Sequence, residues 1–81
     1  MPSRRASPTP QLPHGRAIRA IRTERGLSQE SAALDAEMEP SWLSHIESGR
    51  RDPSWSTVER IAGALGVKVS DIALRAEQNG R

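Results

Sequence analysis

From residue 14 onward, apolar residues recur every three or four positions, which is the spacing of a helix that buries one face. The pattern predicts five helices, over residues 14–25, 28–36, 40–48, 55–65 and 70–77. No segment of useful length alternates with a period of two, so we expect no β-sheet. The chain is therefore expected to be all-α.

Residues with special backbone preferences lie at the ends of these expected helices. Ser28 is a good N-cap for the second helix, and Pro40 suits the first turn of the third, where an N–H has no partner in any case. Ser56 and Glu59 have the spacing of a capping box, which indicates where the fourth helix begins. Glycines that can terminate the first, third and fourth helices follow at Gly26, Gly49 and Gly66.

The length of 81 residues is that of a single domain. Residues 1–13 are rich in Pro, Ser and Thr and cannot bury enough apolar surface to fold, so we expect a flexible N-terminal tail. Arg4 and Arg5 could serve there as an arm against a nucleic acid, or the tail could be idle. We expect the helical domain over 14–77 and a short C-terminal tail over 78–81.

Two charged residues fall beside the apolar faces when residues are placed about 100° apart around each helix. Arg22 lies one turn beyond Ile18, and Glu47 lies one turn beyond Leu43. An arginine and a glutamate drawn next to a core are tolerated at low cost only if they pair. We therefore predict an Arg22–Glu47 salt bridge that joins the first and third helices, the alternative being that both side chains reach solvent.

The opposite face of the third helix is small and polar. It consists of Ser41, Ser44, His45 and Ser48, with Trp42 at its edge. Arg50 and Arg51 follow directly after the helix. Such a face suits docking in a DNA groove, because Ser and His can bond base edges or phosphates and Arg binds phosphate. The alternative is an ordinary solvated helix face. Trp42 could pack on a thymine methyl or on the sugar-phosphate, or it could cap the core beside Ile46, and we expect it to be partly buried.

Composition narrows the candidate chemistry. The formal net charge is +2, and all 12 cations except Lys68 are arginines, which bind phosphate well but are also common in GC-rich genomes. The absence of cysteine excludes disulfides and thiolate sites and fits a cytoplasmic protein. His14 and His45 lie in different helices, so no metal site, cofactor or catalytic constellation is expected and the chain is not predicted to be an enzyme. No apolar run has the roughly 18 residues of a membrane span.

The motifs of residues 15–73 resemble those of a known family. Residues 15–73 resemble the phage-repressor and Cro type of helix-turn-helix protein, the XRE family, through GLSQE at 26–30, WLSHIESGRRDPS at 42–54 and IAGALGV at 61–67. The resemblance implies a five-helix fold in which the second and third helices form the helix-turn-helix. It also implies a sequence-specific regulator of transcription that places its third helix in the major groove of double-stranded DNA.

The resemblance further implies roles for individual residues. Positions that touch the DNA backbone are matched by Ser28, Gln29, Ser48, Arg50 and Arg51. Positions of the recognition helix that face bases or nearby phosphates are matched by Pro40, Ser41, Trp42 and His45. Gln29 can also reach a base. Arg22 and Glu47 match a structural ion pair, in agreement with the analysis of helix faces.

The chain departs from this family around the turn. Glu37 stands where Gly is usual, Ala32 replaces a usual Leu, and Glu39 replaces a Ser, Thr or Asp cap. A left-handed Glu37 would cost about 1 kcal/mol, because a Cβ is disfavoured in that conformation. The acidic turn would also repel phosphate if it faced DNA, and Pro40 donates no hydrogen bond. A protein-interaction module with weak or no DNA binding therefore remains the alternative function.

The resemblance also suggests how the protein assembles. A homodimer on a palindromic operator would set two recognition helices one DNA turn apart, about 34 Å. The fourth and fifth helices, with Trp55, Val69 and Leu74, are the candidate dimer seam, and Trp55 is expected in the core or in an interface. No small-molecule ligand is expected. Controllers of restriction–modification systems and antitoxins both have this single-domain length.

Overall fold

The computed structural model describes residues 13–79. Within that range the chain forms five helices and no strand: α1 (Pro13–Glu24), α2 (Gln29–Asp35), α3 (Pro40–Glu47), α4 (Trp55–Leu65) and α5 (Val69–Asn79). The predicted all-α, five-helix fold is confirmed. The expected N-terminal tail, including Arg4 and Arg5, lies outside the described residues apart from Pro13. None of these helices is long and apolar enough to cross a membrane.

Side-chain caps begin α2 and α4. The Ser28 hydroxyl accepts the backbone N–H of Ser31 at 3.0 Å, as the sequence predicts. The predicted capping box at Ser56 is wrong. Ser54, in an extended conformation, accepts the N–H of Thr57 at 3.2 Å and caps α4, whereas Ser56 already lies inside the helix. Of the two nearby serines, the earlier one, Ser54, is the N-cap.

Helix α5 is longer than the sequence predicts. Its start is held by the Asp71 carboxylate, which accepts the N–H of Lys68 at 2.9 Å. The helix begins at Val69, and it continues to Asn79, into the expected C-terminal tail at 78–81.

The same turn closes α1, α2, α3 and α4: a residue with left-handed backbone follows the helix, and the next N–H bonds back to the helix. After α2 this residue is Glu37 (φ 59°), while the other three turns use glycine. The N–H of Met38 completes the turn by donating to the carbonyl of Ala33 at 2.9 Å. The expected strain at Glu37 is thus present, at a cost of about 1 kcal/mol.

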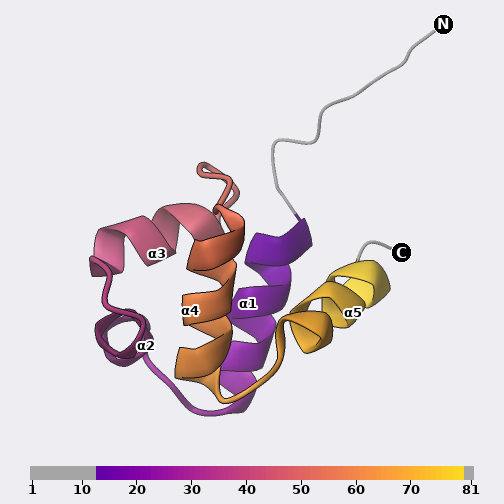
Figure 1. The fold of residues 1–81 in the computed structure, drawn as a ribbon, viewed down its shortest axis with the longest axis horizontal. Helices are drawn as coiled ribbons and strands as arrows, with labels where there is room; N and C mark the ends of the chain where they lie inside the picture. The colour runs from indigo at the N-terminus through magenta and orange to yellow at the C-terminus, as the bar shows by residue number, and fades with distance from the viewer. Residues whose placement is uncertain (1–12, 80–81) are drawn as a thin grey trace, which may run out of the picture.

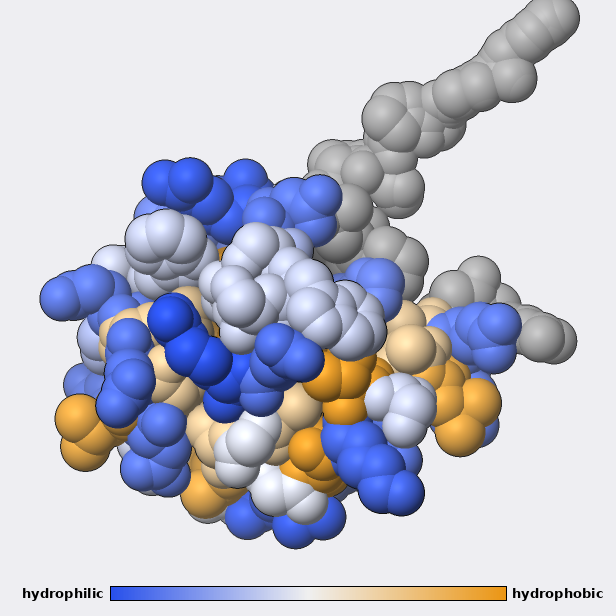
Figure 2. Space-filling view, in the orientation of Figure 1, coloured by the Kyte–Doolittle hydropathy of each residue, from blue (hydrophilic) through white to orange (hydrophobic). Residues whose placement is uncertain are grey.

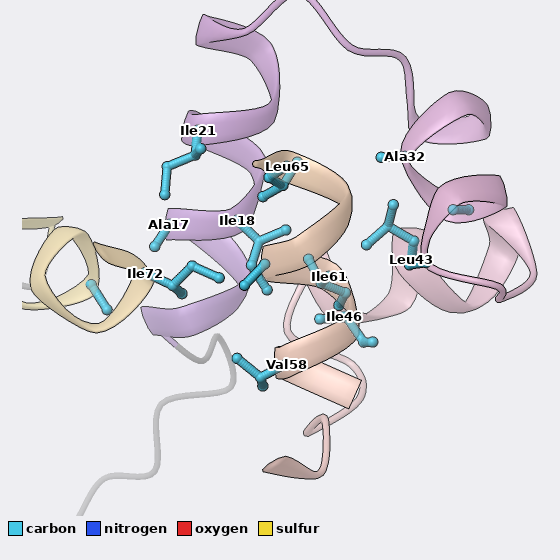
Figure 3. Packing of buried hydrophobic residues seen from close by; sticks show 14 residues of the cluster. Ala17, Ile18, Ile21, Ala32, Leu43, Ile46, Val58, Ile61, Leu65 and Ile72 are labelled. Atoms are coloured by element: carbon cyan, nitrogen blue, oxygen red, sulfur yellow. The ribbon is translucent and has the colours of Figure 1, made fainter. Parts of the chain in front are cut away.

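The core lies around α1 and α4, which stand side by side at the centre of the molecule (Figure 1). Helix α5 packs on α1 on one side, while α2 and α3 pack against each other and the central pair on the other. The largest fully buried side chains, seen in Figure 3, are Ile18, Leu43, Ile46, Ile61, Leu65 and Ile72. Helix α2 adds only Ala32 and Ala33, so its contact with the core is thin, as expected.

Helices α1 and α3 meet backbone to backbone at Gly15. A Cβ built there would overlap the carbonyl oxygen of Ile46 and would lie 3.2 Å from the carbonyl oxygen of Glu47. Only glycine permits this approach without a shift of one helix. The contact fixes the C-terminal end of α3 against α1, a role that the sequence analysis did not assign to Gly15.

Candidate nucleic-acid interface

A buried ion pair holds α3 in place. The Arg22 guanidinium donates to Glu47 twice, from Nε to Oε2 at 2.7 Å and from Nη2 to Oε1 at 3.0 Å. Arg22 Nη1 also donates to the carbonyl of Leu27 in the α1–α2 loop, at 2.7 Å. Because both charged residues are buried, every one of these bonds offsets a desolvation cost. The predicted salt bridge is present, and it connects α1, the loop and α3.

Gln29, the first residue of α2, joins the same network. Its Nε2 donates to Glu47 Oε1 at 2.9 Å, so the carboxylate serves both the arginine of α1 and the amide of α2. The resemblance assigns Gln29 to the DNA surface only, and its link to Glu47 was missed. Because Gln29 comes three and four residues before the buried Ala32 and Ala33, helical spacing places it on the inward side of α2, but that spacing does not name its partner in α3.

The outward face of α3 is polar. Ser41 and Ser48 are exposed, and Ser44 and His45 are half-buried. Trp42, at the edge of this face, is 45% exposed and counts among the exposed large apolar side chains, so it is less buried than expected. Pro40 is the first residue of the helix, so the end of α3 carries no N–H at that position.

The loop after α3 folds back onto the end of the helix. The backbone N–H groups of Arg50 and Arg51 donate to the carbonyl of His45 at 2.8 and 3.2 Å, and the Ser48 hydroxyl donates to the same oxygen at 3.2 Å. The Arg51 guanidinium lies over the Trp42 ring, 5.1 Å from its centre. Two exposed arginines therefore lie beside the serine and histidine face.

The acidic turn between α2 and α3 lies next to α4. Glu37 and Glu39 line a hollow together with Trp42 and with Thr57 and Arg60 of α4. The acidic turn thus lies beside α4 and beside Trp42, at the edge of the polar face of α3. Glu39 also makes no side-chain hydrogen bond to the start of α3, as its departure from the usual cap residues predicts.

The three residues expected in a dimer seam lie in two different hollows of the surface. Trp55, 67% exposed, and Val69 line a largely apolar groove of about 660 Å³ between the start of α4 and α5. Figure 2 shows hydrophobic surface exposed between these helices. Leu74 lies about 140° further around α5, in a second hollow with Ile21 and Val67. The three residues do not share one face, and Trp55 is not part of the core.

The described part of the chain contains no cluster of three or more His, Asp or Glu side chains that could hold a metal ion. The polar groups of the candidate interface are hydroxyl, imidazole, amide and guanidinium groups, next to the Trp42 ring and Pro40. Such groups donate to and accept from base edges and phosphates.

Comparison with known proteins agrees with this geometry. The helix-turn-helix domain family matches residues 15–76. The immunity repressor of Bacillus phage phi105 is 50% identical over 58 residues, which are 72% of this chain and 40% of the repressor's own length. The control protein C.BamHI of Bacillus amyloliquefaciens is 35% identical over 63 residues, covering 76% of this chain and 78% of the control protein.

Two solved structures share the fold over most of their length. The clp gene regulator ClgR from Corynebacterium glutamicum superposes with a TM-score of 0.85 at 27% identity, covering 93% of this chain and 97% of ClgR. The restriction–modification controller C.AhdI from Aeromonas hydrophila gives 0.73 at 30% identity, covering 75% and 92%. The chain therefore belongs to the phage-repressor (XRE) type of helix-turn-helix DNA-binding transcription regulators.

Proposed function

We propose that this regulator binds a palindromic operator as a homodimer, with α3 of each copy in the major groove. The observation that carries the proposal is the short, polar outward face of α3 on a helix held rigid by a buried ion pair. A reading helix must hold its side chains steady against base edges, and the contacts of Arg22 and Gly15 with α3 supply that rigidity.

The proposed roles follow from the chemistry of each group. Ser41 and His45 bond base edges, while Pro40 contributes only apolar contact. Ser28, Gln29, Ser48, Arg50 and Arg51 contact the DNA backbone. Trp42, stacked under Arg51, packs against a thymine methyl or a sugar while the guanidinium edge remains free for phosphate.

The dimer seam is proposed at the groove between α4 and α5. An exposed Trp55 beside an apolar groove gives each copy both a knob and a recess, which is the self-complementary surface that a twofold contact needs. Leu74 lies on another part of α5 and is left outside this seam. Trp55→Ser should shift the sedimentation coefficient from dimer to monomer at micromolar concentration. Leu74→Ser, the matched control, should remain dimeric, and the reverse result would move the seam to Leu74.

Selection of bound sites from random duplex DNA tests the central claim. A twofold-symmetric consensus is expected, with half-sites one helical turn apart. Binding to it should weaken steeply as salt rises, because phosphate contacts release counterions. No binding to any duplex at low salt would instead favour a protein-interaction module on the same fold.

Two substitutions separate base reading from phosphate binding. His45→Ala should weaken the selected site by roughly 5- to 150-fold more than random DNA. Arg50→Ala should weaken both about equally and lower the salt dependence by about one phosphate contact. An unchanged ratio of specific to random binding in His45→Ala would remove His45 from the reading face.

The biological setting is proposed at a coarser level. The restriction–modification controllers among the similar proteins favour a controller, and an antitoxin is the other candidate. A neighbouring endonuclease and methyltransferase gene pair, or a toxin gene, would decide between them. The protein is proposed to act by binding alone, without catalysis, in the cytoplasm and on the nucleoid when bound to DNA.

A further inference from the structure

Arginine recurs at every third position from α1 into the turn after it, at Arg16, Arg19, Arg22 and Arg25. The side chain of Arg22 is buried in the ion pair with Glu47, whereas the other three are exposed. Arg25 lies beside α5, where it lines the hollow around Leu74. Arg16 and Arg19 have no part in the fold or in the interface described above.

Arg19 lies at the edge of α1 that meets α3. Gly15 and Arg22 are the α1 residues whose contacts with α3 are described above, one through its backbone and one through its ion pair. Arg19 follows Gly15 by four positions and precedes Arg22 by three, so it lies on the same flank, further toward solvent. Arg16 lies about 60° beyond Arg19 around the helix. The exposed polar surface of α3 therefore continues across the contact between the helices onto these two arginines.

The fold itself gives no reason for either charge. The salt bridges found within residues 13–79 use Arg22 and Arg75, so Arg16 and Arg19 have no carboxylate partner in that range. Like charges three positions apart repel each other on a helix. Arg16 also lies close to the N-terminus of α1, where the helix dipole disfavours a positive charge. Both charges thus oppose the stability of α1, and an anionic partner would offset that repulsion.

The rest of the described domain is not basic. All 10 Asp and Glu residues of the chain lie within residues 13–79, while three of the 12 cations lie outside that range. A polyanion is then attracted only where cations gather away from carboxylates. The carboxylate of α1, Glu24, is bound by Arg75 of α5, on the other side of the helix. The flank with Arg16 and Arg19 is therefore a local site of positive charge next to α3.

We propose that Arg16 and Arg19 bind phosphates of the operator, so that α1 extends the DNA interface beyond the helix-turn-helix. The inference rests on the proposed placement of α3 in the major groove and adds a contact that this placement does not require. A helix in the major groove has one DNA backbone on each side. Arg51, over the Trp42 ring, lies on the flank of α3 away from α1. The arginines of α1 face the opposite backbone, and their guanidinium groups match the geometry of phosphate.

The first test measures how binding to the selected site depends on salt. Arg19→Gln should reduce the slope of log affinity against log salt by about 0.9 in each half-site, and adding Arg16→Gln should reduce it by the same amount again. The ratio of specific to random binding should not change, because a phosphate contact carries no base identity. Arg25→Gln, from the same row of arginines but beside α5, is the matched control and should keep the native slope.

Two results would overturn the assignment in this test. One is a native slope in Arg16→Gln/Arg19→Gln, and the other is an equal reduction in Arg25→Gln, which would indicate a general effect of net charge. The double variant should melt at or above the native temperature, because it removes a repulsion within α1. A lower melting temperature would give the two arginines a structural role instead.

The second test locates the contact on the DNA. Uncharged methylphosphonate linkages replace the phosphates of the selected half-site one at a time. The native protein should lose about threefold or more in affinity at phosphates where Arg16→Gln/Arg19→Gln loses nothing. Arg50→Ala should keep the full loss at those same phosphates. Equal losses for the native protein and the double variant at every phosphate would overturn the contact.

The same measurements separate failure of this inference from failure of the proposed function. If α3 does not bind DNA, Arg50→Ala and Arg16→Gln/Arg19→Gln will both leave the salt dependence of duplex binding unchanged. If only the contact from α1 is wrong, Arg50→Ala will lower the salt dependence by about one phosphate contact while the double variant keeps the native slope.

Discussion

Replacing Glu47 by Ala probes the feature on which the fold and the interface both depend. The change removes a carboxylate that is 3% exposed and that accepts three hydrogen bonds, two from Arg22 and one from Gln29. Arg22, 8% exposed, would keep its charge with only the carbonyl of Leu27 as a partner. A buried charge without its counter-charge is the costliest outcome of such a change.

The expected loss can be worked from this geometry. Breaking a buried pair by removing one partner costs about 3–5 kcal/mol. A chain of this length has a free energy of unfolding of only about 4–12 kcal/mol, and each kcal/mol is worth about 4–8 °C in a small domain. Glu47→Ala should therefore lower the melting temperature by about 12 °C or more. If the native free energy of unfolding lies at the low end of that range, the variant should be barely folded.

Thermal and urea unfolding followed by circular dichroism, at one fixed protein concentration, measure the effect. Glu77→Ala, at an exposed site on α5, is the control and should change stability by less than about 0.5 kcal/mol. The double variant Arg22→Met/Glu47→Leu should recover most of the loss, because an apolar pair of similar volume can replace a buried ion pair. An unchanged melting temperature for Glu47→Ala would refute the reasoning.

Three further changes test other parts of the fold by the same melts. Gly15→Ala should cost about 1–3 kcal/mol or more, because its Cβ would overlap the backbone of α3; Gly63→Ala, in open space within α4, should stabilise instead. Glu37→Gly should stabilise by up to about 1 kcal/mol, since it relieves the left-handed backbone; a lower urea midpoint would contradict this. Hydrogen bonding from Arg75 lowers the pKa of Glu24. The pair therefore stabilises the fold above the ordinary glutamate pKa, and this stabilisation is lost as pH falls through the lowered pKa. Arg75→Gln should have a lower free energy of unfolding than the native protein near neutral pH, and the two values should converge in acid.

Much of this architecture was predictable from the sequence, because the signals are local. A helix buries one face at intervals of three or four residues, and its ends depend on groups a few positions away, so Ser28, Pro40 and the terminal glycines indicate where most helices begin and end. The partnership of Arg22 and Glu47 also followed from local periodicity, since each lies on the flank of its own apolar face. Two opposite charges that are buried beside a core have a low energetic cost only if they pair with each other.

Tertiary structure decided the rest, because those features depend on how helices pack. The approach of Gly15 to α3 exists only once α1 and α3 have met. Gln29 binds Glu47 of another helix, and the spacing within α2 places Gln29 on the inward side of that helix without naming its partner. The separation of Trp55 from Leu74 depends on how α5 is rotated against α1 and α4. Sequence therefore determined which residues form each helix and which face turns inward, while packing determined which side chains meet and which are left free to bind DNA.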